Sequence, residues 1–186
     1  MGFQKVALLH SHQKLPAFHD YTISDLIDLC GLAACIRESV SRVAIPITPI
    51  DRRPLHTFER FLKRERPDLV GISSYTCTAS SVPDYARLAK THGATVIAGG
   101  FHASALPEEM LAIPEVDAVV RGEGEVTLNE FVRTGSPEGV AGMSYRNNGS
   151  VIHNPDRPVI ADLDALPLPL RGIRPARFGL SGLDYN

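Results

Sequence analysis

Short apolar runs alternate with amphipathic stretches through the first 135 residues. The runs have the length and composition of strands buried on both faces. They are Lys5–His10, Arg42–Ile50, Leu69–Ser73, Thr95–Ala98 and Ala118–Val120. Between and after them, apolar residues at helical spacing predict helices over Ser24–Ser39, Leu55–Arg66, Ser81–His92, Pro107–Ile113 and Glu125–Arg133. This alternation is typical of βαβ units. We therefore predict an α/β fold with a doubly wound, five-stranded parallel sheet in the flavodoxin-like order 2-1-3-4-5.

Local signals place several ends of these elements. Ser24 can cap the first helix, Pro67 ends the second, and Gly93 is suited to the C-cap of the third. Pro46 lacks an N–H group to donate to a neighbouring strand. It therefore indicates that the second strand lies at an edge of the sheet.

The pattern changes after Gly135. Asn147-Asn148-Gly149 lies between two short apolar runs and predicts a β-hairpin. From Asn154 onwards the chain is rich in proline and leucine and has little periodicity, which is typical of an extended linker. We therefore predict an α/β domain over residues 1–135 and a hairpin with a linker over residues 136–186.

Three of the predicted strands run into loops of small, glycine-rich or hydroxyl residues. In an open parallel sheet such loops lie at the carboxyl edge, where ligands bind. Small residues on three adjacent loops leave room for a broad, flat ligand. The candidate binding residues are those of the three loops together with the loop after the first strand. They are Ser73, Ser74, Tyr75 and Thr76; Gly99, Gly100, Phe101 and His102; Gly122, Glu123, Gly124 and Glu125; and His10, Ser11 and His12.

Each of these loops also has a purely structural interpretation. A glycine pair can serve as a plain turn between strand and helix, and hydroxyl residues can cap the helix that follows. Glu123 and Glu125 suit the positive end of a helix dipole. Because both carboxylates would repel a phosphate, that loop favours amide or hydroxyl donors on a ligand.

Composition and charge exclude several classes of function. The net charge of −2 shows no electrostatic footprint for nucleic acid. No apolar run approaches the ~20 residues that span a bilayer. Three cysteines do not suggest a disulfide scaffold, so we expect a cytoplasmic protein.

We also predict no catalytic residue and no metal site, because no nucleophile–base set and no convincing zinc set can be assembled from the spacing. The first strand is followed by His10-Ser11-His12 and not by the Gly-x-Gly-x-x-Gly fingerprint of dinucleotide-binding proteins. The sequence therefore argues against binding of a nicotinamide dinucleotide.

Three ordered segments carry a resemblance to a known family. They are Pro67-Asp-Leu-Val-Gly-Ile-Ser-Ser-Tyr-Thr, Val96-Ile-Ala-Gly-Gly-Phe-His-Ala-Ser and Val116-Asp-Ala-Val-Val-Arg-Gly-Glu-Gly-Glu. Together they resemble the N-terminal cobalamin-binding domain of cobalamin-dependent radical S-adenosylmethionine enzymes. Asn154-Pro-Asp-Arg-Pro and the residues after it are similar to that family's link to its catalytic barrel.

The resemblance implies that a corrin ring lies on the carboxyl edge, with its nucleotide tail inserted beside the third and fourth strands. His10–His12 would then approach the lower ring face, and His102 would contact the corrin edge. The Asp-x-His-x-x-Gly motif of proteins that ligate cobalt through histidine does not occur in this sequence. We therefore expect base-off cobalamin without a protein histidine ligand.

The sequence departs from the family in one respect, because the Cys-x-x-x-Cys-x-x-Cys motif for a [4Fe–4S] cluster is missing. We expect the cluster and S-adenosylmethionine only in a longer or partner protein that carries the radical barrel. The chain would then be the cobalamin module of a methyltransferase or cyclase, and would not be catalytic alone. The alternative is a flavodoxin-like domain that senses or scaffolds without a corrin. A phosphate-regulated receiver and a flavin-binding flavodoxin both fit the loop after the first strand poorly.

Overall fold

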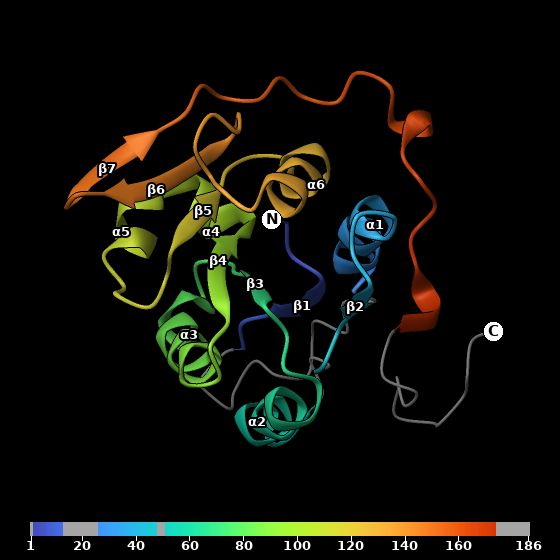
Figure 1. Cartoon of the computed structure of the whole chain (residues 1–186), viewed down its shortest axis with the longest axis vertical. Coiled ribbons are helices and arrows are strands. Elements are labelled where there is room, and N and C mark those ends of the chain that lie inside the picture. Colours follow the sequence, from blue (N-terminus) through green and yellow to red (C-terminus); the bar gives the residue numbers. More distant parts are fainter. Residues whose placement is uncertain (1, 13–25, 48–50, 174–186) are drawn as a thin grey trace.

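The computed structural model describes residues 2–12, 26–47 and 51–173 (Figure 1). Within them, one seven-stranded sheet has the order β2-β1-β3-β4-β5-β6-β7. The strands are β1 (Lys5–His10), β2 (Arg42–Ala44), β3 (Leu69–Ser73), β4 (Thr95–Gly99), β5 (Ala118–Val120), β6 (Met143–Asn147) and β7 (Ser150–His153). The first five are parallel, so the predicted order 2-1-3-4-5 is confirmed.

The predicted count of five strands is wrong for the whole sheet. The hairpin forms as predicted, but β6 pairs antiparallel with β5 and β7 pairs with β6. Without β6, one side of β5 would expose unpaired backbone groups. The hairpin therefore continues the sheet, and the division of the chain after residue 135 stays a prediction.

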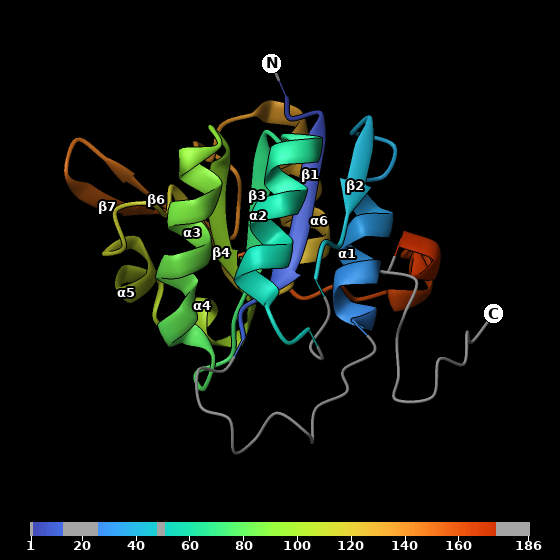
Figure 2. The same cartoon turned by 90° about the horizontal axis from the view of Figure 1, so that it is seen from below.

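Helices cover both faces of the sheet (Figure 2). Helices α2 (Pro54–Glu65) and α3 (Val82–Thr91) lie on one face, and α1 (Ile27–Ile36) and α6 (Gly124–Thr134) on the other. Each pair closes its own apolar core. Phe58 and Tyr85 lie in the first core, and Leu29 and Phe131 lie in the second. Strands with apolar side chains on both faces require such a two-sided cover, because each exposed face would otherwise leave apolar surface in water.

Most helix boundaries agree with the predictions to within two residues, but three elements differ. Helix α1 ends at Ile36, before the expected Ser39, and its predicted cap Ser24 lies outside the described residues. Strand β2 ends at Ala44, because Pro46 cannot continue the ladder; it is an edge strand, as that proline indicated. The segment after β4, expected to be a loop, contains α4 (Gly100–Ala105), and α5 (Pro107–Leu111) follows it.

The segment 154–173, which we call the strap, is largely extended, with short 3₁₀ turns at Leu163–Ala165 and Arg171–Ile173. From β7 it runs back past α6 towards α1 (Figure 1). The backbone N–H of Leu170 donates to the carbonyl of Cys30 at 3.0 Å, and Leu170 and Ile173 pack against the second core. Among the described residues, no helix is both long and apolar enough to cross a membrane.

Candidate functional site

A cavity of about 570 Å³ lies between the sheet and helices α1 and α6. Its walls are mainly apolar: Leu8, Leu29, Leu32, Ile72, Ile97, Ala98, Val120 and Leu128. Gly71, in the middle of β3, also lines it. A Cβ atom at Gly71 would lie 2.9 Å from the Cδ2 atom of Leu8, so the glycine keeps this wall recessed. The cavity continues to the carboxyl edge, where the loops after β3, β4 and β5 line it.

Gly100 makes a close packing of two of these loops possible. Its φ of 87° lies in the left-handed region, which favours glycine. A Cβ atom there would meet the backbone N and O of Ser74 at 2.9 and 2.8 Å. The loops are also joined directly, because Ser74 N–H donates to the Gly99 carbonyl at 3.0 Å and His102 N–H donates to the Ser74 carbonyl at 3.1 Å. The Gly99-Gly100 pair therefore lets two loops pack backbone against backbone, in addition to leaving space for a ligand.

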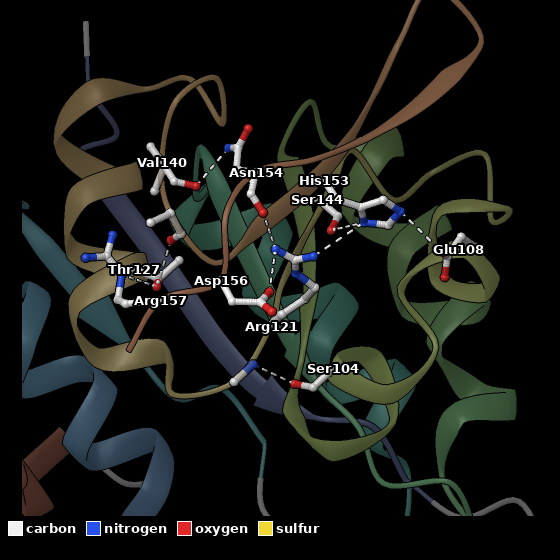
Figure 3. Close-up of polar contacts among 12 residues, drawn as sticks. Ser104, Glu108, Arg121, Thr127, Val140, Ser144, His153, Asn154, Asp156 and Arg157 are labelled. Carbon is white, nitrogen blue, oxygen red and sulfur yellow. Dashed lines mark hydrogen bonds and ion pairs between the residues drawn. The ribbon is translucent and has the colours of Figure 1, made fainter. Parts of the chain in front are cut away.

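Ser104 connects the glycine loop after β4 to the loop after β5. Its hydroxyl donates to the Gly100 carbonyl at 2.8 Å and accepts from the Gly122 N–H at 3.0 Å (Figure 3). Ser104 also lines the cavity. Our sequence reasoning did not select it, although it belongs to the same run as Gly99–His102.

The structure brings nine of the predicted site residues together around the cavity: Ser73, Tyr75, Gly99, Gly100, Phe101, Gly122, Glu123, Gly124 and Glu125. The other six do not line it: His10, Ser11, His12, Ser74, Thr76 and His102. Several of these six contribute to contacts between loops. The Ser11 hydroxyl, for example, donates to Thr78 Oγ1 at 2.7 Å. The Ser74 hydroxyl is buried and has no hydrogen-bond partner among the described residues.

The three predicted histidines have protein partners. Nε2 of His10 lies 2.8 Å from an Asp28 oxygen, and Nδ1 of His12 lies 2.8 Å from the Tyr85 hydroxyl. His102 is buried between Thr76 Oγ1 and Glu109 Oε1, each 3.3 Å away. Nδ1 of His10 is buried and finds no hydrogen-bond partner within the part of the chain that the structure describes. No group of three or more His, Cys, Asp or Glu side chains in the described part of the chain is arranged to hold a metal ion.

The carboxyl edge carries aromatic side chains at the end of β1 and after β3 and β4, and glycines after β5. Tyr75 stacks between His10, at a centroid distance of 6.0 Å, and Phe101, at 5.7 Å. Phe101 is 76% exposed. Gly122 and Gly124 lie on the other side, after β5. The edge therefore carries stacked aromatic side chains after β3 and β4 and glycines after β5. The composition of the loops had predicted small residues along the whole edge.

Charged residues are few in the cavity lining: Asp28, Glu123, Glu125 and Arg157. Burial by itself would raise the pKa of Asp28, but the hydrogen bond and charge of His10 outweigh it. The pKa of Asp28 is therefore lowered from its ordinary value. Burial, together with the Asp28 charge, raises the pKa of the Tyr75 phenol. A tyrosine with a raised pKa stays a neutral hydrogen-bonding group at neutral pH.

Strap residues Arg157, Pro158 and Val159 form part of the cavity wall. Nε of Arg157 donates to Thr127 Oγ1 at 2.8 Å, and its Nη2 binds the Glu130 carboxylate. The N–H of Ile160 donates to Glu123 at 2.6 Å. Sequence reasoning missed these wall residues. The available signal was the Asn154-Pro-Asp-Arg-Pro segment, which we interpreted only as a link.

A polar groove adjoins the cavity and shares Ser104, Gly122 and Arg157 with it. Arg121 lies at its centre, with Nη2 donating to the Asn154 carbonyl at 2.5 Å and pairing with Asp156 at 3.0 Å (Figure 3). His153 lies 3.0 Å from Glu108 and 2.8 Å from the Ser144 hydroxyl. Nε of Arg121 is buried and has no hydrogen-bond partner among the described residues. The contacts of Arg121 with Asn154 and Asp156 hold the start of the strap.

Comparison with known proteins identifies relatives of this arrangement. The family model described as B12 binding domain matches residues 27–132. An uncharacterized methyltransferase of Pyrococcus horikoshii is 37% identical over 123 residues, covering 62% of this chain and 27% of the relative. Cytidylyl-2-hydroxyethylphosphonate methyltransferase of Streptomyces wedmorensis is 34% identical over 112 residues, covering 56% of this chain and 21% of the relative. The anaerobic magnesium-protoporphyrin IX monomethyl ester cyclase of Rubrivivax gelatinosus is 30% identical over 113 residues, covering 54% and 20%.

The fold also matches a solved structure. The cobalamin-dependent S-adenosylmethionine radical enzyme OxsB, solved with aqua-cobalamin bound, superimposes with a TM-score of 0.76 at 20% identity. The match covers 91% of this chain and 24% of OxsB. At this identity the likeness establishes the fold alone. The chain spans between a fifth and about a quarter of the length of the curated relatives it matches.

Proposed function

This chain belongs to the B12-binding domain family, and we propose that it binds cobalamin, with the corrin ring on the carboxyl edge and the nucleotide tail in the cavity. The observation that carries the proposal is the continuity of an apolar cavity of about 570 Å³ with that edge. A flat ring suits the edge and a narrower aromatic tail suits the cavity, since ligand sites are concave and mostly apolar with a few polar groups.

The residues present fit such a ligand. Gly71 and Gly100 are recessed where a Cβ atom would collide with Leu8 and with the Ser74 backbone. The stacked rings of Tyr75 and Phe101 offer an apolar surface beside the ring site. The carboxylates of Glu123 and Glu125 can accept hydrogen bonds from amide groups at the corrin periphery. Bound cobalamin supplies organometallic and radical chemistry that side chains lack. The residues of this chain would bind and orient it.

We also propose that the cobalt is bound base-off and without a histidine ligand. Nε2 of His10 is occupied by Asp28, and both ring nitrogens of His102 have partners. None of the three candidate histidines, His10, His12 and His102, lines the cavity. Nδ1 of His10 has no hydrogen-bond partner among the described residues, but it is buried. A histidine ligand would need an imidazole nitrogen aimed at the metal, so the contacts of the other nitrogens and the burial of this one support its absence.

In its wider context the chain would serve as the cobalamin module of a radical S-adenosylmethionine enzyme of the methyltransferase or cyclase type. The named relatives include two methyltransferases and a cyclase, which supports this class. The [4Fe–4S] cluster and S-adenosylmethionine would then be bound by a radical barrel, in the same protein or in a partner. The alternative, a flavodoxin-like scaffold without a corrin, predicts that the cavity binds no corrinoid.

The test is retention of hydroxocobalamin through desalting, followed by absorption spectroscopy. Wild-type protein should retain close to one equivalent, with the spectrum of base-off cobalamin. Gly71→Leu, which fills the cavity beside Leu8, should lose most of the pigment while remaining folded by circular dichroism. Gly31→Ala is the matched control, because a Cβ atom at Gly31 has nothing within 4 Å. An unchanged apo spectrum for wild-type protein would favour the scaffold alternative. A spectrum of histidine-ligated cobalt would refute only the base-off part.

A further inference from the structure

The strap lies outside the part of the chain that the family model matches, yet it forms one wall of the cavity. The match ends at residue 132, whereas the strap contributes Arg157, Pro158 and Val159 to the cavity lining. Val159 lines the cavity and is still 78% exposed. Val159 therefore lies where the cavity meets solvent.

The beginning of the strap is attached to the carboxyl edge of the sheet. Arg121, directly after β5, donates through Nη2 to the Asn154 carbonyl at 2.5 Å and pairs with Asp156 at 3.0 Å (Figure 3). The Gly142 N–H donates to the Pro155 carbonyl at 2.8 Å. These contacts fix the position at which the chain leaves the hairpin and turns towards α6.

The next residues are attached to α6. Arg157 binds Thr127 and Glu130, which lie three residues apart on that helix. The Ile160 N–H donates to Glu123, the residue immediately before α6. Pro158 and Val159 lie between these two attachments. Both attachments include a charged side chain, Arg157 in one and Glu123 in the other, so they fix this part of the strap against α6.

We infer that the strap wall, through Arg157 and Val159, determines how long a corrinoid with a nucleotide tail is retained, and so selects tailed over tailless corrinoids. This inference rests on the proposed function. The attachments lie on α6 and its preceding loop, and the wall faces the apolar cavity proposed for the tail. A corrinoid without the tail would occupy only the edge and would not contact the wall.

The experiment compares dissociation rates of two radiolabelled corrinoids, cobalamin and its tailless analogue cobinamide, each chased with excess unlabelled compound. Arg157→Ala should speed cobalamin dissociation about tenfold, the equivalent of one charge-assisted hydrogen bond. Val159→Ala, a surface-exposed change that preserves the fold, should speed it about twofold to threefold through lost wall contact. Cobinamide dissociation should not change in either variant. The exposed Arg60 on α2, on the opposite face of the sheet, gives the matched control Arg60→Ala, which should behave as wild type for both ligands.

The outcomes separate the two proposals. If wild-type protein retains neither corrinoid, the proposed function fails. If it retains cobalamin and both variants leave its dissociation unchanged, or speed cobinamide dissociation equally, the strap inference fails and the proposed function stands. If Arg157→Ala does not fold, the dissociation rates measured for Val159→Ala alone test the strap inference. Glu130→Gln should act in the same direction as Arg157→Ala, and the double variant should add little because both remove the same contact.

Discussion

Nε2 of His10, at the end of β1, lies 2.8 Å from an Asp28 carboxylate oxygen on α1. The contact joins the carboxyl edge of the sheet to the helix that forms one cavity wall. His10 also stacks on Tyr75, so a single residue connects the aromatic side of the edge to the acidic margin of the cavity. Asp28 faces the cavity as well, which makes this pair part of the ligand's surroundings without requiring the imidazole to touch a ligand.

This pair gives a pH-dependent prediction. Because the folded-state pKa of Asp28 lies below its ordinary value of 3.8, its ionised form stabilises the fold above about pH 4. That stabilisation is lost as the pH falls through the lowered folded-state pKa. With 44% of the side chain exposed, Asp28→Asn should reduce the free energy of unfolding at pH 7 by no more than about 1 kcal/mol. Urea unfolding should show the gap between wild type and variant closing towards pH 3. A gap independent of pH would contradict the assignment.

Gly100→Ala should destabilise the fold more than other glycine substitutions at positive φ. The new Cβ atom meets the Ser74 backbone at 2.8 and 2.9 Å, and backbone cannot move aside as a flexible side chain can. We expect a loss of about 2–4 kcal/mol, combining left-handed strain with the collision. Gly93→Ala is the control, because Gly93 has a φ of 81° but open space around its Cβ position. It should lose only about 1 kcal/mol. Equal losses in denaturant unfolding would show that the collision relaxes.

Gly71→Ala should discriminate between corrinoids with little change in stability. Its Cβ atom would lie 2.9 Å from Leu8 Cδ2, and the leucine would have to move within the cavity wall. Reduced freedom of the unfolded chain offsets part of this crowding, so the free energy of unfolding should change by under about 1.5 kcal/mol. Affinity for cobalamin should fall several-fold and affinity for cobinamide should not. Titration monitored by absorbance measures both; a matching fall for the two ligands would place the tail elsewhere.

Arg146 on β6 supports a region that precedes β5. Its guanidinium donates to the carbonyls of Leu111, Ile113, Pro114 and Val116. Lysine offers a compact ammonium that cannot reproduce this fork, so Arg146→Lys should reduce the free energy of unfolding by about 1.5–3 kcal/mol. Arg133→Lys, at an exposed position of α6, is the matched control and should change it by under about 0.5 kcal/mol. Indistinguishable thermal unfolding of the two variants would contradict this role.

Much of the fold could be predicted from the sequence because its determinants are local. Leu69–Ser73 and Ala118–Val120 appear at the predicted residues, since a buried parallel strand needs only a short apolar run bounded by turn residues. Pro46 correctly indicated an edge strand, because the missing N–H of a proline is also a local property. Helix α4 was missed because Gly99-Gly100 reads locally as a loop. The left-handed Gly100 instead turns the chain directly into a helix.

In the candidate site, too, local features could be predicted from the sequence and contacts between distant residues could not. Glycine positions and their loops are visible in the sequence, because a missing side chain is a local property. The partners of His10, His12 and His102 are not, since Asp28, Tyr85 and Glu109 reach them only through the folded chain. The strap wall depends on Arg157 meeting Thr127 and Glu130, some 30 and 27 residues away.

The sequence by itself therefore determined the strand order, the glycine-lined edge and the family resemblance. The tertiary structure decided that the hairpin extends the sheet, that the three histidines contact Asp28, Tyr85 and Glu109 on neighbouring helices, and that the strap forms part of the cavity wall. The physical reason is that apolar periodicity and glycine conformation act within a few residues. Hydrogen bonds and cavity walls depend instead on which distant segments the packed cores bring together.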